Sequence, residues 1–156
     1  MRGIKALRQA VAFERPDLIY CLGDILYGAG DQDACAAAKA LKDLGVPILA
    51  VRGNCDYAED ENELGFPLPL ARSIERGNHE IHLCHRPLNI AFPAGDFVMN
   101  GHTHYKALYR DSGVVYLNPG SIALPRDGVA SYATMDETCI RLCSASEGRE
   151  IQRLDI

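Results

Sequence analysis

The sequence predicts one α/β domain, and three observations carry that prediction. The chain has 156 residues, close to the ~150 residues of an average domain. Hydrophobic residues make up 47% of it and charged residues 24%, which is ordinary for a globular protein and excludes a disordered or collagen-like chain. In the first half of the chain, segments with helical periodicity are followed by short apolar runs. In the second half, turn residues separate short segments in which apolar and polar side chains alternate. We expect residues 1–156 to form a single domain.

Residues 17–56 carry the pattern of a βαβ unit, and a helix precedes it. Apolar side chains at spacings of three and four indicate a helix, and continuous apolar runs are typical of strands buried on both faces. The helix between the two strands is alanine-rich and stops at Gly45, because glycine is favoured just past a helix end. The connection is expected to be a right-handed crossover. We therefore predict helices over residues 2–13 and 30–45 and buried strands over residues 17–23 and 46–51.

The second half of the chain is rich in strands. Turn residues such as those of Asn-Pro-Gly and Arg-Asp-Gly separate short segments of alternating apolar and polar side chains, a pattern typical of strands. Segments of this kind favour a largely antiparallel arrangement. The predicted strands cover residues 71–76, 80–84, 96–100, 107–110, 114–117, 131–136, 139–143 and 151–156.

Charge and cysteine content restrict the partners and the compartment. There are 16 basic and 21 acidic side chains, so the formal charge of −5 gives no bulk attraction to nucleic acid or to an anionic membrane. No apolar run approaches the ~18 residues of a membrane-spanning helix, and the first residues lack a signal-peptide core. The six cysteines include no Cys-x-x-Cys motif, and three lie inside apolar runs. We expect reduced thiols and a cytoplasmic protein.

Polar side chains follow four of the predicted strands, at the point where each strand ends. Ligands of open α/β sheets bind beyond the carboxyl ends of the strands, so these side chains are expected to meet at one edge. Carboxylate, amide and imidazole together suit Mn²⁺, Fe²⁺ or Zn²⁺ better than Ca²⁺. Each residue alone also fits a plainer role, as a turn residue or a surface histidine. The candidates are Asp24, Asn54, His85, His102 and His104.

In this order, the strand-end motifs resemble those of the calcineurin-like metallophosphoesterases, most closely the YfcE-like subgroup of small prokaryotic phosphodiesterases. The family is marked by Asp-x-His, Gly-Asp, Gly-Asn-His/Cys-Asp/Glu, a histidine after a strand, and Gly-His-x-His. The last four blocks are matched by Gly23-Asp24, Gly53–Asp56, His85 and Gly101–His104. Further similarities to the subgroup lie in residues 66–69, 117–121 and 130–133. The resemblance implies a layered αββα sandwich.

The resemblance also implies roles for the strand-end residues. Asp24 would bridge two metal ions. Asn54, His85 and His102 would complete the second metal position, and His104 would serve the first. The expected cofactor is a divalent metal, Mn²⁺ first, with Fe, Zn, Ni or Co as alternatives and one or two ions in the site.

Two residues near the expected ligands have more open roles. Cys55 stands where other branches of the family carry a histidine that protonates the leaving group. A thiol with a pKa near ~8.5 is a weaker acid than imidazolium, so leaving-group activation would pass to metal-bound water. Relatives read His-Gly-His after the third strand, whereas this chain reads His85-Arg86-Pro87. Arg86 is therefore either a solvated loop residue or, with Asn54, a contact to the substrate phosphate.

The chain departs from the family at its first block, because no Asp-x-His motif precedes Asp24. Relatives carry this motif on a first strand just before the first helix, so the resemblance implies an N-terminally truncated fold with that strand missing. The first metal position would keep only Asp24 and His104, which favours one ion at the second position. Residues 18–23 would have an unpaired strand edge, and such edges favour association. We expect a homo-oligomer through that edge or a local rearrangement.

The expected function is that of a hydrolase, a metal-dependent phosphodiesterase that attacks a small phosphoester with metal-activated hydroxide. Two alternatives stay open: a catalytically impaired binding or scaffold module of the same fold, and a fragment with a misplaced start. Nucleic-acid binding is not favoured, because the basic residues are scattered and no aromatic platform is evident. The sequence does not name the physiological substrate.

Overall fold

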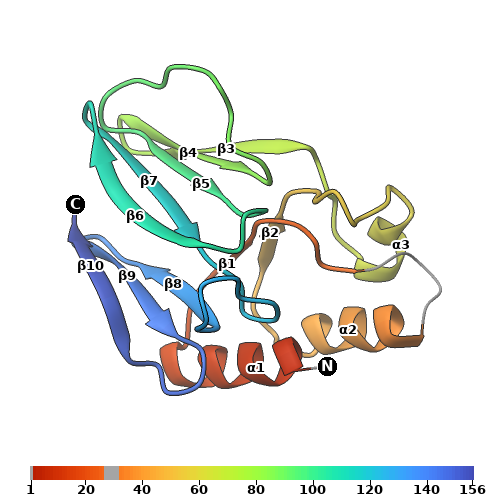
Figure 1. The fold of residues 1–156 in the computed structure, drawn as a ribbon. Helices are drawn as coiled ribbons and strands as arrows, with labels where there is room; N and C mark the ends of the chain where they lie inside the picture. The colour runs from red at the N-terminus through yellow and green to blue at the C-terminus, as the bar shows by residue number, and fades with distance from the viewer. Residues whose placement is uncertain (1, 27–31) are drawn as a thin grey trace.

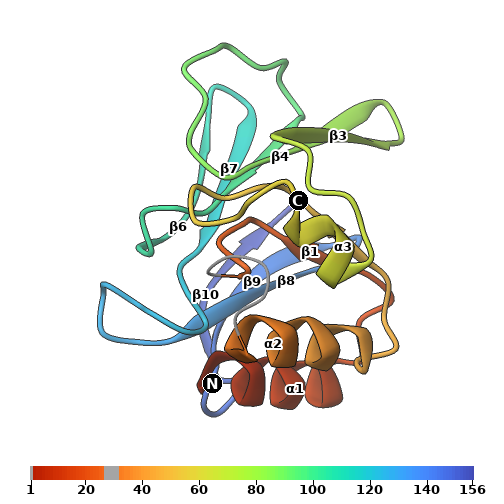
Figure 2. The ribbon, with the colours of Figure 1, turned by 90° about the vertical axis from the view of Figure 1, so that its right-hand side faces the viewer.

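The protein is described here by a computed structural model, which covers residues 2–26 and 32–156. Its elements form layers: α1 (Arg2–Glu14) and α2 (Gln32–Lys42) lie on one side, two smaller sheets lie in the middle, and a five-stranded sheet lies on the other side (Figures 1 and 2). This mixed architecture confirms the predicted α/β fold class. The remaining elements are β1 (Ile19–Cys21), β2 (Ile48–Ala50), α3 (Asp60–Leu64), β3 (Ala71–Arg76), β4 (His79–Cys84), β5 (Phe97–Asn100), β6 (Lys106–Asp111), β7 (Val114–Pro119), β8 (Ser131–Met135), β9 (Cys139–Ser144) and β10 (Glu150–Asp155).

The predicted βαβ unit is present as β1, α2 and β2. The two strands are parallel, with Ile19 opposite Ile48 and Cys21 opposite Ala50. Both strands are shorter than predicted, and β1 is half-buried along its length instead of buried on both faces. The reason is that, within residues 2–26 and 32–156, β1 pairs with β2 alone and its other edge has no strand partner.

The largest sheet has the strand order β3-β4-β5-β7-β6 and is mixed, although most strand pairs of the second half are antiparallel, as expected. The outer pairs β3–β4 and β6–β7 are antiparallel, whereas β4–β5 and β5–β7 are parallel. Residues 85–96 cause this difference, because they carry the chain from the end of β4 back to the start of β5. The carboxyl ends of β4, β5 and β7 therefore lie at the same edge of the sheet.

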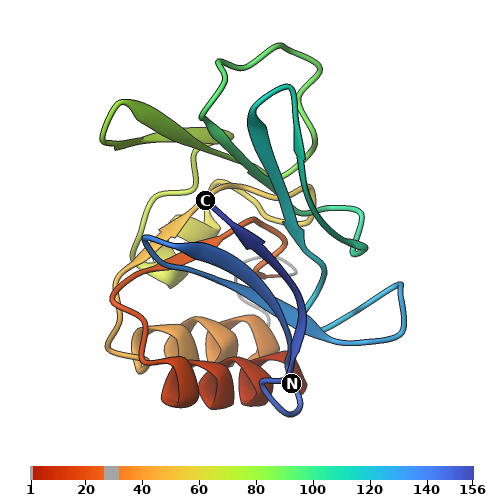
Figure 3. The same ribbon diagram turned by 90° about the vertical axis from the view of Figure 1, so that its left-hand side faces the viewer.

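Strands β10, β9 and β8 form a separate antiparallel sheet, which lies between α1 and the large sheet (Figure 3). The main core lies between the two sheets and is built from buried aliphatic side chains, which include Leu83, Met99, Leu117, Ile140 and Leu142. A second core packs α2 and α3 against β2, with Ala38, Ala50 and Leu64 at its centre. Both cores hold the strand ends in place.

A cavity of about 770 Å³ lies beside the unpaired edge of β1. Its lining includes Val11 of α1, Tyr20 of β1 and Thr134 of β8. Strand β8 is also an edge strand in its sheet, so the cavity lies between two strand edges. At the far side of the cavity, the carboxylate of Glu14 accepts hydrogen bonds from Tyr132 and Arg141, which attaches α1 to the β8–β9 hairpin.

Helix α3 was not predicted, because five residues are too few to show helical periodicity. Asp60 accepts a hydrogen bond from the amide of Tyr57, and Gly65 ends the helix in the left-handed conformation. No helix among residues 2–26 and 32–156 has the length and apolar character needed to cross a bilayer.

Candidate metal centre

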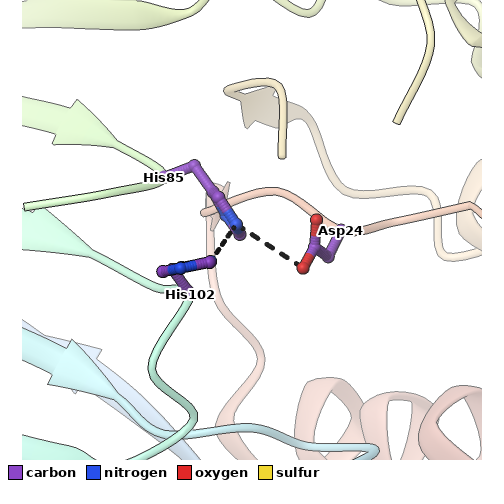
Figure 4. A group of neighbouring side chains, drawn as sticks. All are labelled: Asp24, His85 and His102. Atoms are coloured by element: carbon purple, nitrogen blue, oxygen red, sulfur yellow. Dashed lines mark hydrogen bonds and ion pairs between the residues drawn. The ribbon is translucent and has the colours of Figure 1, made fainter. Parts of the chain in front are cut away.

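The strand-end residues come together at one edge, as the sequence predicts. Asp24 follows β1, Asn54 follows β2, His85 follows β4 and His102 follows β5. One ligand atom from each of Asp24, His85 and His102 lies within 4.8 Å of the others (Figure 4). The side chain of Asn54 joins this group through His85, with 3.0 Å between its Oδ1 and the Nε2 of His85. Four segments far apart in the sequence therefore contribute to one site.

The imidazole of His85 is the centre of the group. Its Nδ1 lies 2.7 Å from the backbone oxygen of Leu22. A carbonyl oxygen only accepts, so Nδ1 must carry a proton and donate it to Leu22. This leaves Nε2 directed at the group, 3.2 Å from Nδ1 of His102 and 3.5 Å from Oδ2 of Asp24. The orientation of the buried ring is therefore fixed by the backbone of β1's carboxyl end.

The atoms around His85 Nε2 suit a cation. Oδ1 of Asn54 and Oδ2 of Asp24 are both acceptors, and a neutral His85 with its proton on Nδ1 presents a third lone pair to them. Such a group of lone pairs can hold a divalent metal ion. Two oxygens and two imidazole nitrogens form a donor set for Mn²⁺, Fe²⁺, Zn²⁺ and related divalent ions. The residues present fit the predicted metal.

His102 is held by its loop and by its electrostatic surroundings. Its backbone has a φ of 62°, a left-handed conformation that is uncommon for a residue other than glycine. Burial lowers the pKa of His102, the charges of Arg86 and Arg126 act in the same direction, and the charge of Asp24 acts against them. A lowered pKa favours the neutral imidazole, which is the form that binds a metal.

Asn118, at the end of β7, holds the loop that carries His102. Its Nδ2 donates to the carbonyl of Gly101 at 2.7 Å and lies within hydrogen-bond distance of Thr103 Oγ1. Its Oδ1 accepts a hydrogen bond from the amide of Gly120. Asn118 therefore lies directly behind the site, where it supports the loop of His102.

The other predicted site residues lie around this group. His104 has its Nδ1 2.8 Å from the carbonyl oxygen of Leu124 and stands outside the cluster of ligand atoms. Arg86 is exposed next to His85. Cys55 is half-buried, and desolvation together with the charge of Asp24 raises the pKa of its thiol. The thiol is therefore protonated at neutral pH.

Two charged residues near the site had no role in the sequence interpretation. Arg126 was not singled out, although its amide donates to the carbonyl of His104 and its charge acts on His102. Asp56 belongs to the Gly53–Asp56 motif, and its buried carboxylate accepts hydrogen bonds from loop amides. The motif was a signal for Asp56, whereas nothing in the sequence distinguished Arg126 from the other scattered basic residues.

Comparisons with known proteins identify the family of the chain. Residues 2–138 match the calcineurin-like phosphoesterase superfamily domain. Phosphodiesterase YfcE of Escherichia coli K12 is 28% identical over 149 residues, which cover 86% of this chain and 80% of that protein. Probable metallophosphoesterase YsnB of Bacillus subtilis 168 is 29% identical over 141 residues, which cover 84% of this chain and 80% of that protein.

Solved structures share the fold. The structure of YfcE, a phosphoesterase from E. coli, has a TM-score of 0.87 with 24% identity, over 99% of this chain and 92% of that one. Vps29 from Entamoeba histolytica, solved with zinc, has a TM-score of 0.66 with 20% identity, over 97% of this chain and 88% of that one. The layered arrangement of sheets and helices is therefore common to all three proteins.

Proposed function

The chain belongs to the calcineurin-like phosphoesterase superfamily, in its YfcE-like subgroup, and we propose that it hydrolyses small phosphodiesters with a divalent cation held by Asp24, Asn54, His85 and His102. The observation that carries the proposal is the position of His85 Nε2, which faces two acceptor oxygens and a second imidazole. The relatives named as phosphodiesterase and metallophosphoesterase support the reaction class.

A bound divalent cation would supply a Lewis acid that polarises the phosphoryl group and lowers the pKa of a water ligand. The chain's own residues have separate tasks. His85 and His102 provide neutral nitrogen ligands, and the amide of Asn54 provides an oxygen ligand that also lies on the exposed side of the site. Arg86, whose charge acts on His102, would attract the phosphate as a charge-assisted donor. Cys55 stays a neutral thiol and is not the nucleophile.

We further propose Mn²⁺ as the metal, because two oxygen and two imidazole ligands leave coordination places for water and substrate, and Fe, Zn, Ni and Co remain alternatives. His104 would help to hold a second ion that Asp24 bridges. The six cysteines are all free, which supports the proposed cytoplasmic location. The net charge of −5 argues against a nucleic-acid substrate.

The test is hydrolysis of a chromogenic phosphodiester by the purified chain, first treated with a chelator and then supplied with Mn²⁺ or another divalent ion. We expect activity to return with metal and to fall at least ~100-fold in His102→Ala, since even residues behind the metal ligands typically cost about 10–100-fold. His79→Ala is the matched control, because His79 is an exposed histidine of β4 outside the site.

The outcome also separates the scaffold alternative from the enzyme. A folded chain that binds Mn²⁺ but shows no turnover with any ion would contradict the proposed activity and favour a binding module. That alternative has an observation in its favour, because Arg86 and Pro87 stand where relatives continue with Gly-His. Activity that survives in His102→Ala would instead refute the ligand assignment.

A further inference from the structure

We propose that Asp56 is the positioning residue of the candidate metal centre. Its carboxylate accepts hydrogen bonds from backbone amides of the loops after β1 and β2, and these bonds fix the position of Asp24 relative to His85 and His102. The inference rests on the proposed function, since it assigns a task relative to the metal ligand Asp24. Asp56 itself belongs to no cluster of ligand atoms among the described residues, and its carboxylate is bonded to backbone amides. Its role would be carried out entirely through the backbone.

The carboxylate of Asp56 is buried, with 7% of the residue exposed, and makes four hydrogen bonds to amides. Oδ2 accepts from Asp24 at 2.7 Å and from Gly53 at 2.8 Å. Oδ1 accepts from Ile25 at 2.6 Å and from Leu26 at 3.0 Å. A carboxylate has about four lone-pair sites, so the loop amides use its full capacity. The loop after β1 is thus tied to the loop after β2 by one side chain.

The tie matters because the backbone of Asp24 has a φ of 56°, a conformation that residues other than glycine rarely adopt. The amide of Cys55 donates to Asp24 Oδ1 at 2.9 Å. Oδ2 then lies 3.5 Å from Nε2 of His85. Asp56 fixes the main chain of Asp24 and the Cys55 amide fixes its side chain, so the metal-facing oxygen has one defined position.

Close packing of the two loops supports the same conclusion. A side chain at Gly53 would meet the backbone nitrogen and the carboxylate of Asp24. A side chain at Gly23 would meet the backbone of Gly53 and the ring of His85. The loops after β1 and β2 therefore touch directly, and Asp56 joins them at the point of contact. Loss of its carboxylate leaves four amides without an acceptor at that point.

The replacement Asp56→Asn tests the inference, because it keeps the volume but replaces one acceptor oxygen with a donor that faces N–H groups. We expect the affinity for Mn²⁺, measured by calorimetric titration of the metal-free chain, to fall about 10–100-fold. Asp60→Asn is the matched control: Asp60 is also buried and accepts a backbone amide, that of Tyr57, but it does not contact the loop of Asp24. Thermal unfolding of both variants reports their general loss of stability.

A positioning role requires weaker Mn²⁺ binding by Asp56→Asn than by Asp60→Asn at a temperature where both are folded. Equal affinities in the two variants, or wild-type affinity in Asp56→Asn, would overturn it. If Asp56→Asn does not fold, Asp56→Glu is titrated instead; it keeps both oxygens on a longer side chain, and unchanged affinity there would also overturn the inference. A wild-type chain that binds no Mn²⁺, or a His102→Ala variant that binds it normally, would instead show that the proposed function has failed.

Discussion

At the scale of single residues, the site depends on hydrogen bonds that leave each ligand one orientation. His85 donates to Leu22, and the amide of Cys55 holds one oxygen of Asp24. In both residues one polar atom is bonded to the backbone, and the other is directed at the common centre. This preorganisation reduces the loss of side-chain freedom on metal binding, because the rotamers are already fixed before the metal arrives.

Asn118 offers a residue-scale prediction, because it holds the His102 loop without facing the metal. The replacement Asn118→Asp keeps the shape but removes the Nδ2 donor to Gly101, so the carbonyl loses its partner and a charge is buried. We expect the free energy of unfolding in urea to fall by about 1–3 kcal/mol, with a parallel loss of Mn²⁺ affinity. Asn89→Asp is the control, since Asn89 is exposed. Unchanged stability in Asn118→Asp would contradict the role.

The convergence of the candidate ligands at one edge could be predicted from the sequence, whereas the hydrogen bonds made by the residues behind them could not. Asp24, Asn54, His85 and His102 all follow apolar runs, so local pattern and the geometry of parallel strands indicate one edge. The tasks of Asp56 and Asn118 depend on partners that come close only in the folded chain: Asp56 bonds the amide of Asp24, separated by 32 positions, and Asn118 bonds Gly101, separated by 17. No local pattern contains that information.

At the scale of elements, the parallel order of β4, β5 and β7 explains why the histidines meet. Residues 85–96 return the chain to the start of β5, so β4 and β5 end side by side and deliver His85 and His102 to one edge. Short alternating segments predicted the strands themselves, with bounds within one or two residues of those observed. They did not predict the parallel pairs β4–β5 and β5–β7, because alternation of polar and apolar side chains is the same in parallel and antiparallel strands.

Asp96, at the end of the segment of residues 85–96, bonds this segment to β4. These bonds predict how the stability of the chain depends on pH. Its carboxylate lies 2.9 Å from Nε2 of His82 and accepts the amide of Glu80 at 3.0 Å, and these bonds lower the pKa of Asp96 below its ordinary value of 3.8. The folded state therefore binds fewer protons than the unfolded state in the acid range. The stabilisation is complete above the ordinary pKa and is lost as the pH falls through the lowered one.

The measurement is urea unfolding of the metal-free chain at neutral pH and at a series of pH values below the ordinary pKa of Asp96. We expect Asp96→Asn to lose about 1–3 kcal/mol of unfolding free energy at neutral pH, and to lose less than the wild type on further acidification. Asp155→Asn serves as control, because the side chain of Asp155 is 78% exposed. Parallel acid profiles for wild type and Asp96→Asn would contradict the assignment.

At the scale of the whole molecule, the middle layer is divided. Sheets β1–β2 and β10-β9-β8 do not pair with one another among the described residues, and the cavity of about 770 Å³ separates their facing edges. The core between the sheets and the ion pair of Glu14 with Arg141 hold the layers together around it. The candidate metal centre lies at the carboxyl ends of the strands and does not include the residues that line this cavity on the β8 side.

Two strand edges that have no strand partner within the described residues lie beside a cavity lined by both apolar and charged side chains. These edges predict association of the chain with itself, because unpaired backbone groups favour added strands. We expect light scattering behind size exclusion to show a mass that rises with protein concentration. Thr134→Lys, which places a charge on the edge strand β8 at the cavity, should shift the protein toward monomer. Ser146→Lys adds the same charge in an exposed turn between β9 and β10 and should leave the association unchanged. A wild-type chain that is monomeric at every concentration would exclude association, and an equal effect of both lysines would place the contact elsewhere.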